Sequence, residues 1–274
     1  FPRLRTYDVR NYRIECSIDF EKKTICGTVT ITLTPLGRGF ERFDLDASEM
    51  RISAVALESV EPTPSKEKSP EAQSDLPKGY AETGPPAPPA PSISKRVLTF
   101  AHEEPRLTID LAPATGPLGR GFGPQDTLTV SIAYSATPRK GIYFVGPDAA
   151  YPDKPVLAWT QGEPEDNHYW VPCYDFPNDR ATSETLVTVP EIYRAVSNGK
   201  FIESVPHPES KTITWHYRES VPHVSYLFSI VAGDLVEFRD QWKDVPLVHY
   251  VSKRDADEET VKRSFKNTGD MIGC

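Results

Sequence analysis

An apolar residue at every second position is the feature of this 274-residue sequence that most restricts its fold. Along residues 12–20 the alternate residues are all apolar: Tyr12, Ile14, Cys16, Ile18 and Phe20. Side chains of a strand point alternately to opposite faces, so this spacing predicts a half-buried strand. The same spacing, or a short apolar run, recurs in residues 24–34, 43–45, 52–57, 97–100, 107–111, 127–134, 185–189, 195–197, 212–217, 224–231 and 247–251. The chain is therefore predicted to be all-β, with many strands.

Two segments depart from the strand pattern. Residues 61–92 hold nine prolines and mixed charges. This composition buries too little apolar surface to offset the entropy lost on ordering, so the segment is predicted to be a solvent-exposed insertion in a loop between strands. Residues 255–274 predict a helix instead, because acidic residues at 257–259 suit a helix N-terminus and apolar residues follow at helical spacing.

Composition excludes several classes of partner. The formal net charge is −8 and the sequence pI is about 5.4, with no cluster of basic residues. Nucleic acid is therefore not expected as a direct partner. No apolar run approaches the ~20 residues that a membrane-spanning helix needs, so no membrane-spanning segment is expected.

The cysteines do not predict a disulfide framework. Cys16 shares the apolar face of its strand, whereas Cys26 alternates with threonines on the polar face of the next strand. The two sulfur atoms are thus expected on opposite faces of a sheet, without a bridge. Cys173 has no histidine base at a known distance, so we interpret it as a packed thiol rather than a nucleophile.

Residues 161–179 form the most unusual segment, QGEPEDNHYWVPCYDFPND, which mixes acids, amides, aromatics and prolines between plain strand patterns. An irregular, proline-braced segment on a β scaffold is typical of side chains held out toward a ligand. Trp170 and Tyr174 are expected to pack at a junction rather than to line a pocket. Asp179 and Arg180 are expected to form a salt bridge of small net value.

No complete catalytic centre can be assembled from the sequence. A zinc peptidase needs two histidines one helical turn apart with a glutamate between them. The nearest approach, HEEPR at residues 102–106, has arginine at the second ligand position and a proline that would interrupt a helix. The other histidines lack paired metal spacing, and His216 is expected to be a surface residue of a strand.

Several stretches together resemble the M1 zinc aminopeptidases of the aminopeptidase N type: KGIYF (140–144), QGE (161–163), YWVPCYD (169–175) and PNDRATSE (177–184). The opening YDVRNYRI (7–14) and the turn VSNG (196–199) fit the same family. The resemblance covers nearly the whole chain, but only the N-terminal domain of the family plus the first turns of its catalytic domain. It implies a saddle-like β-sandwich of mostly antiparallel strands over residues 1–254, followed by a truncated start of the catalytic domain at 255–274.

The resemblance also implies roles for two residues. The family's matching glutamine and glutamate reach from the β domain into the active-site cleft, where the glutamate helps to bind the free α-amino group of a peptide substrate. Gln161 and Glu163 are therefore the expected substrate-binding residues. Zinc is expected in the full-length parent, held by the family's zinc motif beyond Cys274, and neither metal ligands nor catalytic residues are expected in this chain. Alone, the chain is not expected to hydrolyse peptides.

Two alternatives remain at this point. An M1-like β domain also occurs in a transcription-factor subunit that lacks the zinc site, which favours a non-catalytic scaffold for protein interaction. The intact Gln161-Gly162-Glu163 tripeptide argues against a scaffold, which has no use for an amine-binding carboxylate. A stand-alone carbohydrate-binding sandwich is a third interpretation, and it draws only on the aromatic content.

Overall fold

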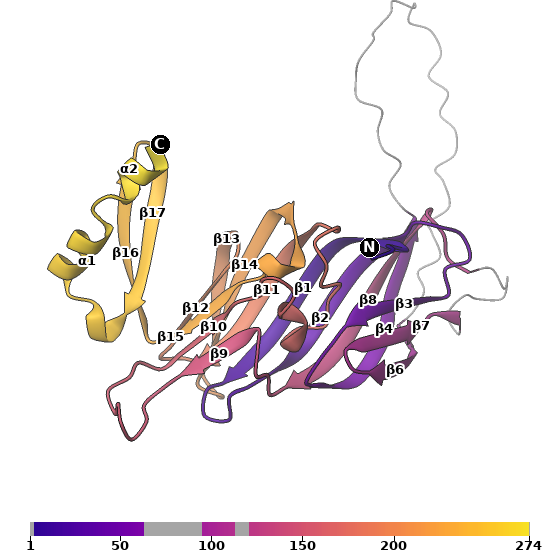
Figure 1. The fold of residues 1–274 in the computed structure, drawn as a ribbon, viewed down its shortest axis with the longest axis horizontal. Coiled ribbons are helices and arrows are strands. Elements are labelled where there is room, and N and C mark those ends of the chain that lie inside the picture. Colours follow the sequence, from indigo (N-terminus) through magenta and orange to yellow (C-terminus); the bar gives the residue numbers. More distant parts are fainter. Residues whose placement is uncertain (1–2, 63–94, 113–120, 274) are drawn as a thin grey trace, which may run out of the picture.

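The computed structural model describes residues 3–62, 95–112 and 121–273 and consists mainly of strands (Figure 1). In chain order the strands are β1 (Tyr7–Asp19), β2 (Thr24–Pro35), β3 (Arg42–Asp46), β4 (Met50–Pro62), β5 (Arg96–Val97), β6 (Thr99–Glu103), β7 (Arg106–Asp110), β8 (Asp126–Ala136), β9 (Ile142–Val145), β10 (Leu157–Thr160), β11 (Ala181–Pro190), β12 (Arg194–Ser197), β13 (Lys200–His207), β14 (Thr212–His223), β15 (Ile230–Gly233), β16 (Leu235–Trp242) and β17 (Val245–Ser252). Two short helices follow, α1 (Glu258–Phe265) and α2 (Thr268–Gly273). The all-β prediction is confirmed.

Eight strands form the largest sheet, in the order β13-β14-β11-β1-β2-β8-β4-β5. Its neighbouring strands are antiparallel except for β1 and β11, which run parallel. A four-stranded sheet has the order β12-β15-β10-β9, a three-stranded sheet has the order β3-β7-β6, and β16 pairs with β17 alone. The predicted sandwich of mostly antiparallel strands is therefore confirmed.

The unusual segment connects two of these sheets. β10, which precedes it, belongs to the four-stranded sheet, and β11, which follows it, lies beside β1 near the middle of the eight-stranded sheet. Residues 161–180 therefore cross from one sheet to the other. A parallel strand pair such as β1 and β11 cannot be joined by a tight turn, so a long connection elsewhere in the chain is required.

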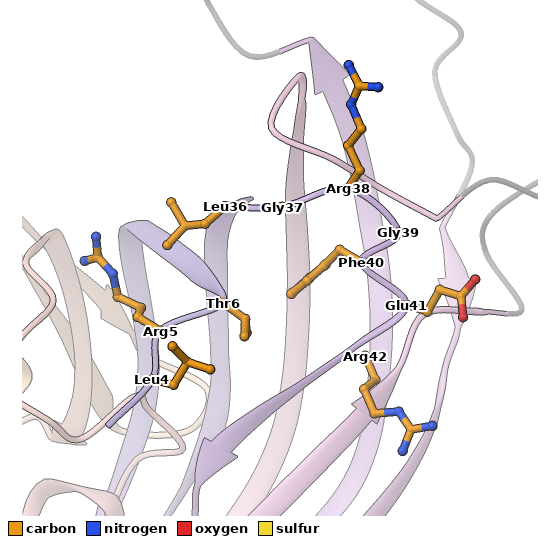
Figure 2. A pocket seen from close by; sticks show the side chains of 10 residues that line it. All are labelled: Leu4, Arg5, Thr6, Leu36, Gly37, Arg38, Gly39, Phe40, Glu41 and Arg42. Atoms are coloured by element: carbon orange, nitrogen blue, oxygen red, sulfur yellow. The ribbon is translucent and has the colours of Figure 1, made fainter. Parts of the chain in front are cut away.

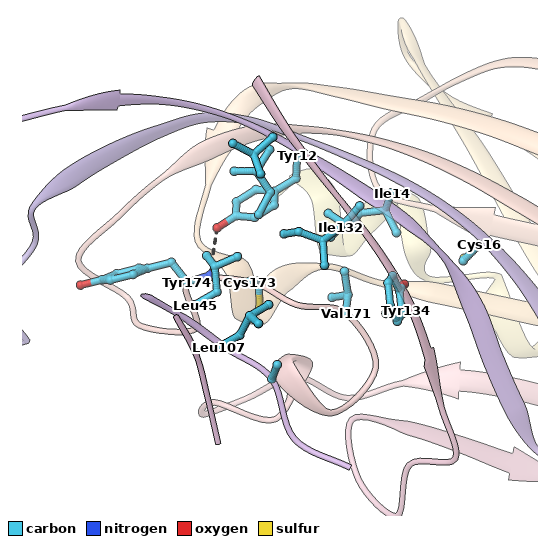
Figure 3. Packing of buried hydrophobic residues seen from close by; sticks show 14 of the residues in the cluster. Tyr12, Ile14, Cys16, Leu45, Leu107, Ile132, Tyr134, Val171, Cys173 and Tyr174 are labelled. Carbon is cyan, nitrogen blue, oxygen red and sulfur yellow. Dashed lines mark hydrogen bonds between the residues drawn. The ribbon is translucent and has the colours of Figure 1, made fainter. Parts of the chain in front are cut away.

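The core lies between the eight-stranded sheet, the three-stranded sheet and the crossing segment. Figure 3 shows buried side chains from all three meeting: Tyr12, Ile14, Ile132, Tyr134, Leu45, Leu107, Val171 and Cys173. The backbone N–H of Tyr174 donates a hydrogen bond of 3.1 Å to the hydroxyl of Tyr12. Full burial of an apolar side chain such as Leu45 or Val171 contributes roughly 2 kcal/mol to the free energy of folding. The crossing segment is thus part of the core.

The cysteine predictions are confirmed. Cys16, Cys26 and Cys173 are free thiols; Cys16 and Cys173 are buried, while Cys26 is exposed. Cys16 lies opposite Gly27 and Ser17 lies opposite Cys26, so the two thiols project from different faces of the sheet. Burial raises the pKa of Cys16 to about 12 and raises that of Cys173 well above its ordinary value, which keeps both thiols protonated.

Some strand boundaries differ from the predictions. Residues 224–231 are not one strand: a 3-10 turn spans Ser225–Leu227, and β15 begins only at Ile230. β13 was not predicted because all eight of its residues are exposed at the edge of the large sheet, where no apolar face is required. Residues 61 and 62, predicted to begin the insertion, are the last two residues of β4. The rest of the predicted insertion, residues 63–92, lies outside the described residues.

The prediction that His216 lies on the surface was wrong. This residue is 9 % exposed, and its Nε2 lies 2.7 Å from Oε1 of Glu184. Arg13 and Arg218 also pair with Glu184, at 2.9 and 2.7 Å. Burial alone would raise the pKa of Glu184, but hydrogen bonds from Arg218, Arg13 and His216 outweigh it and lower this pKa to about 2. A charged network therefore covers the imidazole.

This network predicts acid-sensitive stability. The pKa of Glu184 is about 2 in the folded chain against an ordinary 4.5, so its contribution is present above pH 4.5 and is lost as the pH falls toward 2. Glu184→Gln should lower the free energy of unfolding by roughly 2 kcal/mol at pH 7. Urea denaturation at pH 7 and pH 2.5 measures this difference, which should shrink at the lower pH.

Glu203→Gln is the matched control, because Glu203 lies 3.8 Å from His216 but is 62 % exposed. It should change stability little at either pH. An equal loss for Glu184→Gln at both pH values would contradict the assignment.

The predicted C-terminal helix is present but interrupted between α1 and α2. The carboxylate of Asp257 accepts a hydrogen bond from the backbone N–H of Thr260 and caps α1. Phe265 stacks on His249 of β17, with ring centroids 4.1 Å apart. The helix therefore packs on the β16–β17 hairpin, beside which it is drawn in Figure 1. Across residues 3–62, 95–112 and 121–273, no helix has the length and apolar character needed to cross a membrane.

Candidate functional site

Gln161 and Glu163 lie directly after β10, at the start of the crossing segment. Trp159, Gln161 and Glu163 are exposed, whereas the residues of the alternate positions, Ala158, Thr160 and Gly162, are buried or partly buried. The first three side chains therefore share the solvent side. The backbone N–H of Gln161 donates a hydrogen bond of 2.9 Å to the carbonyl of Gly141, the residue before β9. This bond extends the pairing of β10 with β9 by one step. Within the described residues, neither Gln161 nor Glu163 has a side-chain hydrogen bond or ion pair. Both polar groups are thus available to a ligand.

Gly162 brings the backbone into close contact with a neighbouring loop. A Cβ atom at this position would lie 2.4 Å from Nδ2 of Asn167 and 2.4 Å from the carbonyl oxygen of Tyr226. Its own carbonyl accepts a hydrogen bond of 2.7 Å from the N–H of Asp166. Residue 162 must therefore be glycine for the two exposed side chains on either side of it to keep their positions.

Asn167 holds the crossing segment to the loop before β15. Its side chain is fully buried, and Nδ2 donates to the carbonyls of Ser225 at 2.7 Å and Phe228 at 3.3 Å. Its Oδ1 accepts a hydrogen bond of 2.7 Å from Nε1 of Trp170, which is itself fully buried. Both donors of this amide and its acceptor are therefore used, which makes the contact specific as well as stable.

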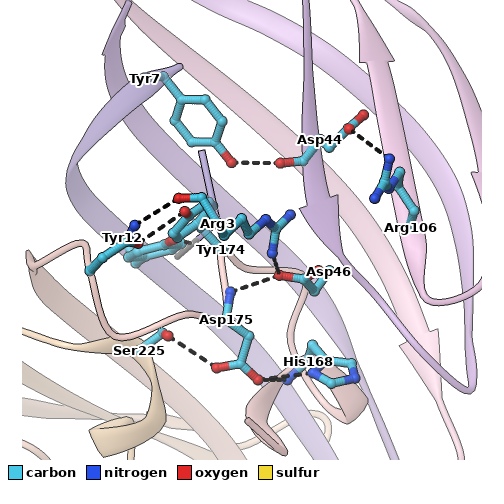
Figure 4. A network of polar contacts seen from close by, with 11 residues as sticks. Arg3, Tyr7, Tyr12, Asp44, Asp46, Arg106, His168, Tyr174, Asp175 and Ser225 are labelled. Atoms are coloured by element: carbon cyan, nitrogen blue, oxygen red, sulfur yellow. Dashed lines mark hydrogen bonds and ion pairs between the residues drawn. The ribbon is translucent and has the colours of Figure 1, made fainter. Parts of the chain in front are cut away.

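A second buried group, Asp175, joins the end of the segment to the same loop (Figure 4). Its Oδ2 accepts from the backbone N–H and Nδ1 of His168, at 3.0 and 2.9 Å, and its Oδ1 accepts from Oγ of Ser225 at 3.0 Å. The N–H of Asp175 donates to Asp46 of β3, which pairs with Arg3 at 2.5 Å. The network joins β3, the turn before β15 and the N-terminal Arg3 through one segment.

The predicted salt bridge between Asp179 and Arg180 is wrong. Asp179 pairs instead with Arg5 at 2.5 Å and accepts a hydrogen bond of 3.0 Å from the N–H of Val9, and only the backbone N–H of Arg180 reaches it. Burial raises the pKa of Asp179, although the amide of Val9 and the charge of Arg5 act in the opposite direction. The carboxylate therefore fixes the N-terminal strand rather than its own turn.

The remaining predicted residues of the segment have structural roles. Trp170 and Tyr174 are buried, which confirms that they pack. Asp166 lies 3.6 Å from Nζ of Lys140, while Glu165 is exposed. Exposure therefore does not separate Glu163 from Glu165. The two acids differ in position: Glu163 directly follows the tightly packed Gly162, and its side chain lies on the same solvent side as Trp159 and Gln161.

A groove among the described residues lies elsewhere. It has a volume of about 540 Å³ and is lined by residues 4–6 and 36–42, without any contribution from residues 161–163. In Figure 2 the side chains of Arg38 and Arg42 point away from each other. The groove therefore does not gather its charged groups around one point.

Metal ligands are not grouped in the part of the chain that the structure describes. No cluster of three or more His, Cys, Asp or Glu side chains there could hold an ion. His102 of the incomplete HEEPR motif lies in β6, and its Nε2 is 3.0 Å from the carbonyl of Ala47. The described residues thus do not fit a zinc ion.

The chain is a β-sandwich whose crossing segment exposes a carboxylate and an amide. Comparison with known families assigns it: the model of the peptidase M1 N-terminal domain matches residues 91–227, and the chain belongs to this family.

Curated relatives are of two kinds. The chain is 23 % identical to leucine aminopeptidase 2 of Candida glabrata, with 85 % of the chain and 29 % of that protein covered. It is also 23 % identical to transcription initiation factor TFIID subunit 2 of Gallus gallus, with 85 % and 20 % covered. The chain therefore spans less than a third of the length of these relatives.

Solved structures share the fold. Yeast LTA4 hydrolase is 18 % identical and superposes with a TM-score of 0.67, covering 98 % of the chain and 35 % of its own length. An M1 zinc metallopeptidase from Deinococcus radiodurans is 18 % identical, with a TM-score of 0.62 and coverage of 97 % and 53 %. At this identity the likeness establishes the fold alone.

The tight packing at residue 162 generates a prediction. Gly162→Ala should lower the free energy of unfolding by roughly 1–3 kcal/mol, because its methyl group overlaps Asn167 and the carbonyl of Tyr226. Gly146→Ala is the control, since a Cβ there meets nothing within 4 Å. Thermal unfolding of both variants measures the difference, and equal melting temperatures would contradict the packing described here.

Proposed function

We propose that this chain is the N-terminal β domain of an M1-type zinc aminopeptidase, and that Gln161 and Glu163 recognise the free α-amino group of a peptide substrate. One observation carries the proposal: the exposed carboxylate of Glu163 has no partner among the described residues and stands beside the backbone of Gly162, which Asn167 packs against. A carboxylate that is free to pair is complementary to an ammonium group. Binding that charge would restrict cleavage to the first peptide bond.

In this proposal the two domains of the parent have different roles, because the described residues do not group metal ligands. In this proposal, residues 1–254 are the β domain and 255–274 begin the catalytic domain. The parent's zinc ion would activate water for attack on the peptide bond, and its ligands would come from the catalytic domain. Gln161 would donate or accept a hydrogen bond beside the ammonium group, and Glu163 would neutralise it.

The four-stranded sheet supplies a surface for that neighbouring domain. The register places Tyr143, Trp159, Val231 and Val196 in one row across its four strands. All four are at least partly exposed, whereas Ala158, Ala232 and Ala195 of the adjacent row are fully buried. An apolar row on the solvent side of a sheet is a favourable packing surface. Trp159, the member of this row on β10, lies two residues before Gln161.

The isolated chain should not hydrolyse aminoacyl-anilide substrates. Purified residues 1–274 should release no anilide above a buffer blank, with or without a chelator, because the described residues do not group metal ligands. Turnover that a chelator abolishes would contradict the assignment of the metal site to another domain.

The role of Glu163 has a direct kinetic test in the full-length parent. Glu163→Ala should raise KM and lower kcat for free-amine substrates, by roughly ten-fold or more in kcat/KM, because the ammonium group loses its counter-charge. Glu165→Ala is the matched control, since Glu165 is an exposed acid two residues away. Unchanged kinetics for Glu163→Ala would remove this residue from the site.

A non-catalytic scaffold is the second candidate, and the similarity to TFIID subunit 2 favours it. The coding sequence after residue 274 separates the two. A His-Glu-x-x-His helix with a further glutamate about eighteen residues later, as the family's pattern requires, supports the enzyme. Loss of those ligands supports the scaffold.

A further inference from the structure

An exposed aromatic pair lies beside the proposed amine-binding residues. Tyr143 of β9 and Trp159 of β10 are directly paired across the two strands. Their rings stack with centroids 5.0 Å apart and an interplanar angle of 29°. Trp159 is nevertheless 39 % exposed. A stacked indole that keeps this much solvent-accessible surface forms a preorganised apolar platform.

The platform and the polar groups face the same way. Trp159 and Gln161 are separated by one residue, and alternation along the strand puts both on the exposed side, as the burial of Ala158 and Gly162 confirms. Two residues of a strand span ~6.6 Å. That distance is close to the reach of a large amino-acid side chain from its α-amino nitrogen. A residue whose ammonium group is held near Gln161 and Glu163 can therefore lay its side chain on Trp159.

Trp159 is also the most exposed member of its row. Val231 and Val196, which continue the row on β15 and β12, are only partly exposed. The row thus presents its broadest apolar surface at the strand that carries Gln161. On this face the carboxylate of Glu163 is complementary to the ammonium group of an N-terminal residue, and the indole of Trp159 is complementary to an apolar side chain of the same residue.

We infer that Trp159, supported by Tyr143, is a specificity-determining residue that contacts the first side chain of the substrate and favours peptides beginning with a large apolar residue. This inference rests on the proposed aminopeptidase function. It assigns no chemical step to either ring: Trp159 contributes an apolar contact that a small first residue such as alanine cannot make.

The test compares substrates in the full-length protein. Kinetics with phenylalanyl- and alanyl-4-nitroanilide give the ratio of the two kcat/KM values for wild type, Trp159→Ala and Trp159→Phe. Trp159→Ala should reduce this ratio roughly ten-fold, mainly through KM for the phenylalanyl substrate, and Trp159→Phe should restore most of it. Phe201→Ala, at an exposed aromatic on β13, is the control and should leave the ratio unchanged.

The outcomes separate two roles of Trp159. If Trp159 only packs against a neighbouring domain, Trp159→Ala lowers kcat/KM for both substrates by the same factor and leaves the ratio unchanged, which overturns the inference. An unchanged ratio in a parent whose activity depends on Glu163 overturns this inference alone. A parent that hydrolyses neither anilide overturns the proposed function together with it.

Discussion

The buried amide of Asn167 is the contact on which the candidate site depends. It joins the crossing segment to carbonyls 58 and 61 residues later in the chain, and Trp170 completes its hydrogen bonding. Leaving such buried carbonyls unpaired would cost roughly 1–3 kcal/mol each, so the segment has one favourable position. Gly162 packs against this same amide, which places Gln161 and Glu163 on the solvent side. The backbone that carries two exposed side chains is thus held in place by one fully buried side chain.

The sheet arrangement explains why the recognition segment lies where it does. Because β10 and β11 belong to different sheets, the chain between them must leave one layer and enter the other. Backbone groups released by this crossing need side-chain partners. Asp175 supplies one to the backbone N–H of His168 within the segment, and Asp179 accepts from the N–H of Val9 in the neighbouring β1. Asp175 and Asp179 are thus buried and hold the backbone, Asp166 is partly exposed and lies near Lys140, and Glu163 and Glu165 are exposed.

Alternation predicted the all-β class and the buried face of β1, because burial on one side of a sheet imposes period two on the sequence. It failed where that constraint is absent: β13 is exposed throughout, and the apolar run at 224–231 is divided by a 3-10 turn, in which the carbonyl of Ser225 accepts from Asn167. Gln161 and Glu163 were identified through family resemblance. The supporting roles of Asn167 and Gly162 were missed because the carbonyls that they contact, of Ser225, Tyr226 and Phe228, are about 60 residues away in the sequence.

The position of Glu163 relative to a bound peptide can be tested by a single structure determination. A crystal structure of the full-length protein with a non-hydrolysable peptide analogue should show the carboxylate of Glu163 about 2.7–2.9 Å from the α-amino nitrogen, as charge-assisted hydrogen bonds require. Gln161 should lie within hydrogen-bonding distance of the same group. A ligand amine bound by other residues, with Glu163 directed away from the cleft, would contradict the account.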